Sequence, residues 1–284
     1  MQLKLVLLTA LTMVAFAANS IFCRLALTDH SNDPLSFTLL RLFSGAVILL
    51  PLVLRKHKNN KIQFTLVSAL PALMLFSYAL FFSLSYVQMT AGTGALIVFP
   101  AAQFTMLGYT VYCGTRLQRF EKLGVIVALS GLVYLVLPGF DVPPLHASIL
   151  MLLAGVSWGV YSLLGKNVAN PSLSTAINFV FTIPLVLFLF FIYGIHLTHM
   201  GLIWAILSGT LTSALGYLLW YIVIKDLQTS TAAVALLSAP AIAAFGGILF
   251  LNENLSLRLV VSSVLILGGL YIKIAGASKK ISST

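Results

Sequence analysis

Long apolar runs alternate along this chain with short segments rich in charged residues, proline and other turn-forming residues. Each run is continuously apolar over about 20 residues, the length that a helix needs to cross a hydrocarbon core about 30 Å thick. The strands of a membrane barrel would instead alternate apolar and polar residues over about 10 positions. The pattern predicts an all-α integral membrane fold of ten transmembrane helices, at residues 3–27, 35–54, 62–86, 91–114, 121–138, 145–168, 173–194, 200–224, 229–251 and 257–276.

Composition excludes a soluble fold. Of the 284 residues, 60% are hydrophobic and only 8% are charged, whereas soluble domains carry about 25% charged residues. Ten spans with short turns use nearly the whole chain and leave no room for a separate soluble domain. The formal charge of +10 does not indicate a nucleic-acid partner, because the basic residues punctuate apolar runs and form no dense stripe. The expected surroundings are the lipid bilayer.

The lysines and arginines are distributed unevenly between the two sides of the predicted membrane domain. Assigning the loops alternately to two sides places thirteen of them on the side of both termini, and three, Arg24, Arg41 and Arg258, on the other. Cytoplasmic loops carry an excess of Lys and Arg, so both termini are expected in the cytoplasm and the protein in the cell inner (plasma) membrane. The first run, which contains Lys4, has the outline of a signal peptide. It continues through Leu27 and is expected to remain as the first span.

The two halves of the chain resemble each other. Residues 86–101 align with residues 226–241, and further matches occur near the start and the end of each half. The matched positions are Gln88 with Gln228, Pro100 with Pro240, Phe16-Ala17 with Trp158-Gly159, and Gly131-Leu132 with Gly269-Leu270. We therefore expect two repeats of five spans, residues 1–142 and 143–284. Five is odd, so the second repeat enters the membrane from the opposite side, which is typical of secondary transporters, although duplication also builds static membrane proteins.

Several short motifs carry a family resemblance. They are Trp158-Gly159 with Lys166 eight residues after the tryptophan, Pro34 followed by Arg41, the prolines Pro100 and Pro240, and Asn252-Glu253 before the last span. Together they resemble the drug/metabolite transporter superfamily, specifically its ten-span EamA-type branch, over essentially the full length. The resemblance implies a transporter of small metabolites, with export of amino acids or related solutes as the expected activity. The chain departs from the family pattern at Phe16-Ala17, where Trp-Gly is favoured, and at Thr115, where an acid matching Glu253 is usual.

Polar and aromatic residues recur at helical spacing within several spans. In a bilayer such groups are expected to face the bundle interior or a water-filled cavity, although Ser and Thr also serve as packing contacts between helices. The stripes are Thr9, Thr12, Phe16 and Asn19; Tyr78, Phe82 and Ser85; Thr93, Phe99 and Gln103; Ser157, Trp158, Tyr161 and Ser162; Ser174, Asn178 and Thr182; and Thr210, Ser213, Tyr217, Trp220 and Tyr221. They predict a central cavity suited to a small amphipathic metabolite, with the candidate substrate-binding residues Asn19, Tyr78, Gln103, Trp158, Tyr161 and Trp220.

Arg41 lies about two turns inside the second span, deeper than a snorkelling side chain needs to be. An intramembrane cation is a functional candidate by default, and Arg41 is a candidate partner for a substrate carboxylate. The alternatives are that it caps a helix end or pairs with Asp29 or Asp33. Arg24 lies at a span end, where an interfacial anchor is expected.

Two prolines and one acid are further candidates. Pro100 and Pro240 lie centrally in the paired fourth and ninth spans, where a proline removes a backbone hydrogen bond and kinks the helix. They are candidate hinges, with a static kink as the alternative. All six carboxylates fall in loops or at helix ends, which argues against a mid-membrane proton relay of the usual kind. Glu253 remains as the candidate coupling residue, or as an ordinary helix-end residue.

The sequence contains no phosphate-binding loop, no His-Glu-x-x-His motif and no clustered histidines. Cys23 and Cys113 are not spaced for metal ligation and are expected to be packing residues. We expect no enzyme activity, no metal and no cofactor, and a small-molecule substrate as the partner. The expected function is secondary transport by alternating access, and the alternative is a facilitated channel or uniporter-like pore without ion coupling.

Overall fold

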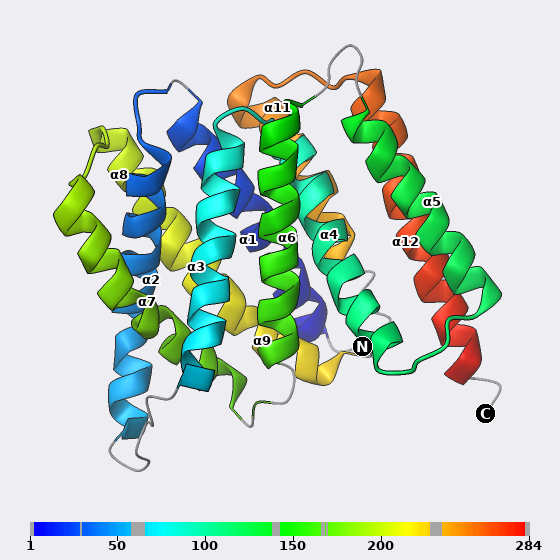
Figure 1. The fold of residues 1–284 in the computed structure, drawn as a ribbon, viewed down its shortest axis with the longest axis horizontal. Coiled ribbons are helices and arrows are strands. Elements are labelled where there is room, and N and C mark those ends of the chain that lie inside the picture. The colour runs from blue at the N-terminus through cyan, green and yellow to red at the C-terminus, as the bar shows by residue number, and fades with distance from the viewer. Residues whose placement is uncertain are drawn as a thin grey trace.

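The computed structural model describes residues 3–28, 30–57, 66–137, 143–165, 168, 170–227 and 235–281. Over these ranges the chain forms helices with short connections and no strand, which confirms the all-helical prediction. Most helices run between the upper and the lower end of the molecule, and α1 begins and α12 ends at the lower end (Figure 1). The helices are α1 (Leu3–Leu27), α2 (Pro34–His57), α3 (Leu66–Tyr86), α4 (Ala91–Tyr112), α5 (Arg119–Val136), α6 (Leu145–Gly165), α7 (Pro171–Tyr193), α8 (His199–Leu207), the π-helix η1 (Ser208–Leu215), α9 (Gly216–Asp226), α11 (Ser238–Leu251) and α12 (Leu257–Ile281).

Eight helical segments are long and apolar enough to cross a membrane, and they coincide with eight of the ten predicted spans. Among them, α8, η1 and the start of α9 form one segment, His199–Trp220. The predicted fifth span corresponds to α5, which has 18 residues and carries Arg119, Glu121 and Lys122 in its first turn. The predicted ninth span corresponds to α11, which has 14 residues. Residues 228–234, which belong to the same predicted span, lie outside the described residues.

The two paired prolines occupy different places in their helices. Helix α4 continues through Pro100 to Tyr112. Pro240, in contrast, is the third residue of α11, where its missing N–H removes no bond within that helix. A turn at Leu237 separates α11 from the helical residues 235–236. Because Pro240 cannot donate to the carbonyl of Leu236, four residues earlier, the helix of the predicted ninth span is interrupted there.

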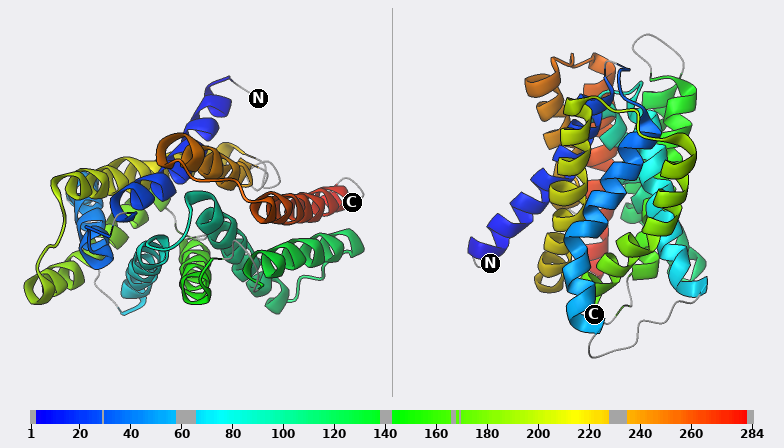
Figure 2. Two further views of the ribbon diagram at one scale, coloured as in Figure 1. Left: turned by 90° about the horizontal axis from the view of Figure 1, so that it is seen from above. Right: turned by 90° about the vertical axis from the view of Figure 1, so that its left-hand side faces the viewer.

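The helices pack in pairs that join the two halves of the chain. Helix α4 packs against α6, α11 against α1, and α2 against α7. Helices α5 and α12 lie side by side at one edge of the molecule (Figure 2). Their backbones approach so closely that a Cβ on Gly124 would overlap the backbone of Lys273, and a Cβ on Gly269 would overlap that of Ala128. Glycine at both positions permits this contact, as small residues do between membrane helices.

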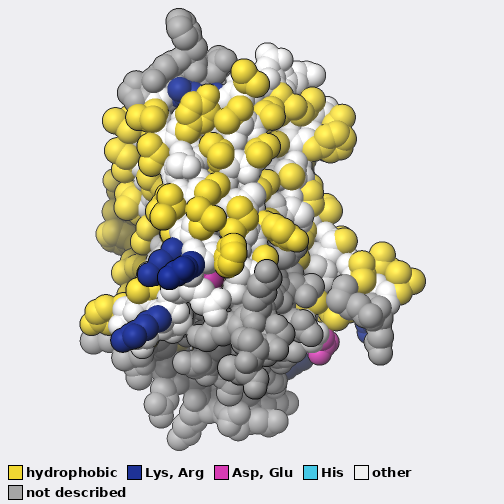
Figure 3. Space-filling view, turned by 90° about the vertical axis from the view of Figure 1, so that its right-hand side faces the viewer, with side chains coloured by type: hydrophobic (Ala, Val, Ile, Leu, Met, Phe, Trp, Pro, Cys, Tyr) yellow, Lys and Arg dark blue, Asp and Glu magenta, His cyan; other side chains and the backbone are white. Residues whose placement is uncertain are grey.

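The outer surface is apolar. Large hydrophobic side chains such as Phe191 and Val264 are 92% and 67% exposed. Over α5 and α12 they form a continuous belt, with Lys and Arg side chains gathered toward its edges (Figure 3). Such a surface is unfavourable in water and fits the hydrocarbon of a bilayer. The chain is a multi-pass membrane protein.

Candidate functional site: a buried cavity between the two halves

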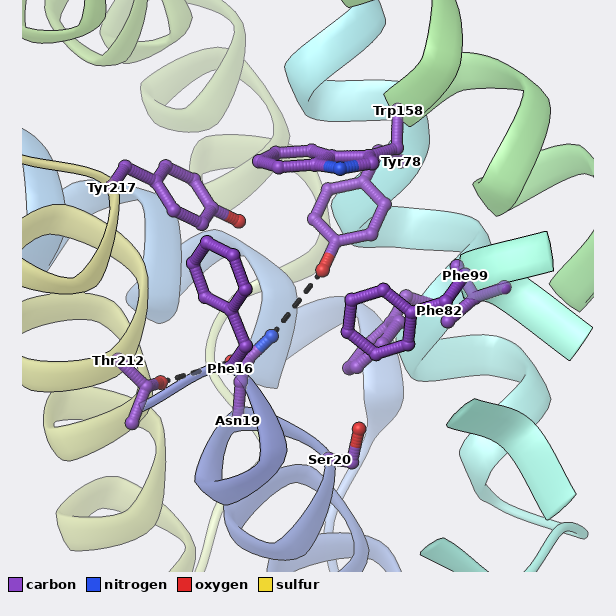
Figure 4. A pocket seen from close by; sticks show the side chains of 10 residues that line it. Phe16, Asn19, Ser20, Tyr78, Phe82, Phe99, Trp158, Thr212 and Tyr217 are labelled. Carbon is purple, nitrogen blue, oxygen red and sulfur yellow. Dashed lines mark hydrogen bonds between the residues drawn. The ribbon is translucent and has the colours of Figure 1, made fainter. Parts of the chain in front are cut away.

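A small cavity lies at the centre of the bundle, between α1, α3, α4, α6 and the segment formed by η1 and α9 (Figure 4). Its volume is about 20 Å³, which is room for roughly one water molecule. The cavity is therefore nearly closed, and a larger solute requires its walls to move. The lining residues are Phe16, Asn19, Ser20, Tyr78, Phe82, Val98, Phe99, Trp158, Thr212 and Tyr217.

Aromatic rings form most of the wall. The Trp158 ring lies 4.9 Å from that of Tyr78 and 4.8 Å from that of Tyr217, measured between ring centroids. Phe16 meets Tyr217 edge-on at 6.0 Å, and Tyr78 contacts Phe82 at 5.3 Å. These are tilted and edge-on arrangements, which are favourable for aromatic pairs. The lining rings, with that of Phe99, come from α1, α3, α4, α6 and α9, so a movement of any of these helices changes the shape of the cavity.

Asn19 is the polar centre of the cavity. Its side-chain amide donates to the Tyr78 hydroxyl at 3.3 Å. Its oxygen accepts hydrogen bonds from Ser208 at 2.8 Å and from Thr212 at 3.1 Å. All four side chains are buried, where a polar group without a partner would cost about 1–3 kcal/mol. Asn19 thereby ties α1 to α3 and to η1.

The π-helix η1 determines which hydroxyls of the eighth predicted span reach this site. Its wider turns present Ser208 and Thr212 to Asn19. The stripe expected from α-helical spacing named Thr210 instead, whose hydroxyl donates to the carbonyl of Ile206 in its own helix. Sequence reasoning missed Ser208 and Thr212 because it assumed 3.6 residues per turn throughout. Single π turns within helices are often found at functional sites.

Arg41 lies behind two rings of the cavity wall. Its side chain is 1% exposed, and its guanidinium carbon is 5.4 Å from the ring centroid of Tyr78 and 5.2 Å from that of Phe82. Its Nε donates to Ser213 at 3.0 Å, and its Nη1 has no hydrogen-bond partner among the described residues. Within the same residues it forms no ion pair with an acid.

The two acids considered as partners of Arg41 do not provide a described contact. The Asp33 carboxylate accepts the backbone N–H of Ser36 at 2.7 Å, at the start of α2. Asp29 lies outside the described residues.

The other predicted site residues lie at different distances from the cavity. Tyr161 stacks on Trp158 at 5.3 Å and accepts a long hydrogen bond of 3.5 Å from Asn178. Trp220 packs against Phe16 at 5.9 Å. Gln103 is half-buried in α4, and its amide nitrogen has no partner among the described residues. The structure thus places Asn19, Tyr78 and Trp158 in the cavity wall, Tyr161 and Trp220 one ring behind it, and Gln103 outside it.

A second polar cluster, formed by Arg24 and Glu253, closes the upper end of the bundle. The Arg24 Nε lies 3.3 Å from the Glu253 carboxylate, and its Nη1 donates to the carbonyls of Tyr86 and Val87 at 2.9 Å each. The carboxylate also accepts the N–H of Ala91, the first residue of α4, at 2.9 Å. We call this group the Arg24–Glu253 clasp.

The clasp joins three elements and sits above the cavity. It connects the end of α1, the turn between α3 and α4, and the turn between α11 and α12. Ser20, a lining residue, is one helical turn from Arg24. Burial raises the pKa of the Glu253 carboxyl above its ordinary value, and the bond from Ala91 and the charge of Arg24 oppose that rise.

The apolar exterior and the helical bundle define a multi-pass membrane protein with a polar, aromatic cavity at its centre. The profile of the EamA-like transporter family matches residues 3–137 and again residues 145–274. The chain belongs to this family.

Three similar proteins bear on this assignment. A Pseudomonas aeruginosa protein named as uncharacterized is 42% identical over 274 residues, 96% of this chain and 95% of that protein. A Salmonella typhimurium protein named "Probable amino-acid metabolite efflux pump" is 27% identical over 206 residues, 66% of this chain and 69% of that protein. A crystal structure that is 16% identical shares the fold, with a TM-score of 0.68 over 96% of this chain and 98% of its own.

Proposed function

We propose that the protein is a secondary transporter that exports amino acids or related small solutes by alternating access. The observation that carries the proposal is the nearly closed cavity, whose wall combines aromatic rings with the Asn19 hydrogen-bond centre. Rings offer apolar contact and a few polar groups fix orientation, which suits a small amphipathic solute. The name of the Salmonella relative supports amino-acid metabolites as the solute and efflux as the direction.

In this proposal the chain consists of two inverted repeats, residues 1–142 and 143–284. Support comes from the family profile, which matches each half separately. The packing is consistent with an exchange of halves, since α4 lies on α6 as α11 lies on α1, while α2 pairs with α7 and α5 with α12. Two similar halves of opposite topology can exchange their conformations and so open one central site to either side in turn.

The proposed orientation places both termini in the cytoplasm and the chain in the inner (plasma) membrane. Support comes from the thirteen basic residues expected on the side of the termini against three on the other. In this orientation the Arg24–Glu253 clasp lies at the external end of the bundle. In this orientation the clasp blocks access from the external side to the cavity. The cavity opens to that side when Arg24 and Glu253 move apart.

Movement and coupling follow from the same contacts. Pro100 lies inside α4, next to the lining residue Phe99, and has no backbone N–H to donate to the preceding turn. It is the proposed hinge. Pro240 contributes a break before α11 in place of a bend within it. Glu253 is the proposed coupling residue, because its carboxyl binds a proton more tightly when the clasp buries it than it would in water.

A facilitated pore without ion coupling is the second candidate function. The observation that favours it is the lining of the cavity, which contains no acidic side chain. Both candidates transport the solute unchanged, and neither involves catalysis. They differ in whether the protein exchanges solute across the membrane.

Counterflow in liposomes tests the proposal. Purified protein is reconstituted into liposomes loaded with an unlabelled amino acid, and entry of the labelled form is followed for each of the twenty standard amino acids. Saturable uptake that is accelerated by internal solute is the expected result. Flux that never saturates and shows no exchange favours the pore and contradicts the alternating-access proposal.

A matched pair of tryptophan variants locates the site. Trp158→Ala enlarges the cavity and removes three ring contacts, those with Tyr78, Tyr161 and Tyr217, so we expect a rise in KM of about tenfold or more. Trp204→Ala makes the same change at a tryptophan that stacks on Phe22 and does not line the cavity. The second variant should keep the wild-type KM. Equal effects of the two changes would contradict the cavity as the binding site.

A further inference from the structure

Arg41 is a buried charge without a counter-charge among the described residues. Its side chain is 1% exposed within a membrane-spanning helix, and no described acid pairs with it. The described carboxylates, those of Asp33, Glu121, Asp226 and Glu253, lie at helix ends or in turns. An isolated charge inside a membrane is costly, and such residues line pathways or meet charged partners.

The contacts that Arg41 does make compensate its charge only in part. The faces of Tyr78 and Phe82 provide cation–π attraction, and Ser213 accepts one hydrogen bond. A guanidinium has five N–H donors in a planar fork, and the Nη1 group here is unsatisfied. The unsatisfied Nη1 group can donate to a carboxylate oxygen, and such charge-assisted hydrogen bonds are among the strong ones.

Arg41 is separated from the cavity by side chains that can move. Tyr78 and Phe82 line the cavity on one side and contact the guanidinium on the other. The bond that holds the Tyr78 hydroxyl to Asn19 is long, at 3.3 Å. A cavity of about 20 Å³ must expand to admit a solute, and displacement of the Tyr78 ring would expand it in the direction of Arg41.

The second half of the chain has no equivalent charge. Helices α2 and α7 both begin with proline, Pro34 and Pro171, and the residue seven positions later is Arg41 in α2 and Asn178 in α7. Asn178 bonds Tyr161, which stacks on Trp158 in the cavity wall. A charge in one half and an amide in the other make the two sides of the cavity unequal, so that a solute with one anionic end binds in one orientation.

We propose that Arg41 is the anion-binding residue of the cavity and that the transported solute carries a carboxylate. This inference rests on the proposed transport function and adds to it the residue that recognises the carboxylate of the solute. The carboxylate replaces the Tyr78 ring as the partner of the guanidinium. The remainder of the solute contacts Trp158, Tyr217 and Phe16.

The test compares solutes that differ only at the carboxyl group. Each of the twenty amino acids is tested in the liposome assay as the free acid and as its carboxamide, and phenethylamine is included as the decarboxylated form of L-phenylalanine. In the wild type we expect the carboxamides and the amine to compete roughly tenfold to hundredfold less well than the acids, the loss expected when a hydrogen bond to a charged group is removed. This comparison needs no variant, so it does not depend on the folding of one.

Two variants then assign the discrimination to Arg41. Arg41→Gln should bind acid and amide with similar affinity, while Arg41→Lys keeps part of the preference through its charge. Arg258→Gln is the matched control, because Arg258 also lies over an aromatic ring, Tyr134, at 5.2 Å, but in the α5–α12 pair away from the cavity. Arg258→Gln should retain the full preference.

The outcomes separate this inference from the proposed function. If the wild type transports amino acids and their amides equally well, the carboxylate inference is overturned while transport stands. If a folded Arg41→Gln protein keeps the preference, Arg41 is not the anion-binding residue. If the wild type transports no member of the panel, the proposed amino-acid transport fails, and this inference fails with it.

Discussion

Replacing Arg24 by methionine should open the upper end of the bundle. Methionine keeps most of the length of the side chain and removes its charge and its donors. The change breaks the ion pair to Glu253 and the two bonds to the carbonyls of Tyr86 and Val87. All three contacts join α1 to elements that would separate from it if this end opened.

The expected magnitude follows from these contacts. A hydrogen bond that involves a charged group contributes about 1.5–3 kcal/mol. The Arg24 and Glu253 side chains are 16% and 11% exposed, so solvent screens the pair only in part. Taking about 2 kcal/mol as the net loss for the whole group, at about 1.4 kcal/mol per factor of ten, the open population at this end rises about 30-fold.

Cys23 provides the measurement. Its thiol is fully buried, one turn from Asn19 on α1 and next to Arg24. The second cysteine, Cys113, is exposed and is replaced by serine in all proteins compared. The rate of Cys23 alkylation by N-ethylmaleimide then reports the fraction of time that this end is open, and it should rise about 30-fold in Arg24→Met.

Arg258→Met is the control for this experiment. Arg258 also bonds a backbone carbonyl, that of Leu137, but it lies between α5 and α12. Its replacement should leave Cys23 labelling unchanged. A labelling rate in Arg24→Met within twofold of the parent protein, or an equal rise in both variants, would show that the clasp does not hold this end closed.

Three further changes should have measurable effects. A Cβ on Gly209 would overlap the carbonyl oxygen of Arg41, so Gly209→Ala should lower the free energy of unfolding by about 1–3 kcal/mol. Gly108→Ala is the control, because no atom lies near the added methyl group, and it should not lower this free energy. The two variants are compared by thermal unfolding in detergent. Asn19→Leu leaves buried hydroxyls without a partner and should cost about 2 kcal/mol in the same assay, so an unchanged melting temperature would contradict the role of this residue. Burial raises the pKa of Glu253 in the closed clasp, so the closed state binds the proton more tightly, and lowering the pH toward that pKa should stabilise the closed state. The rate of Cys23 labelling, divided by the rate in Glu253→Gln at the same pH, should therefore fall as the pH is lowered. A ratio that stays constant would refute this pH dependence.

Most helix positions could be predicted from the sequence, because the contrast between apolar runs and polar breaks is strong in a membrane protein. Where this contrast is weaker, the predicted span bounds agree less well with the observed helices. Charged residues in the first turn of α5 shorten its apolar stretch, and Pro240 interrupts the ninth predicted span. Asn19, Tyr78 and Trp158 were placed at the centre because helical spacing aligned them with other polar or aromatic residues.

The missing parts of the site depend on contacts that no local pattern encodes. Ser208 and Thr212 face Asn19 because of the π-helix, and the segment Ser208–Leu215 carries no signal that distinguishes it from an ordinary helix. Arg24 and Glu253 are 229 residues apart in sequence. The sequence predicts Arg24 as an interfacial anchor and Glu253 as a coupling residue or an ordinary helix-end residue, and only the fold brings the two together.

The π-helix also changes how this crossing responds to a change in its length. A π turn has the form of an α-helix that has taken in an extra residue without moving its flanking turns. Deleting one residue from Ser208–Leu215 should therefore let the segment relax to an α-helix while Tyr217 keeps its place beside Trp158. The same deletion in α3, ahead of Tyr78, has no extra residue to remove and should rotate Tyr78 and Phe82 by about 100°, away from the cavity. The two halves are therefore unequal in their tolerance of insertions and deletions, because α3, which places Tyr78 and Phe82, is α-helical throughout.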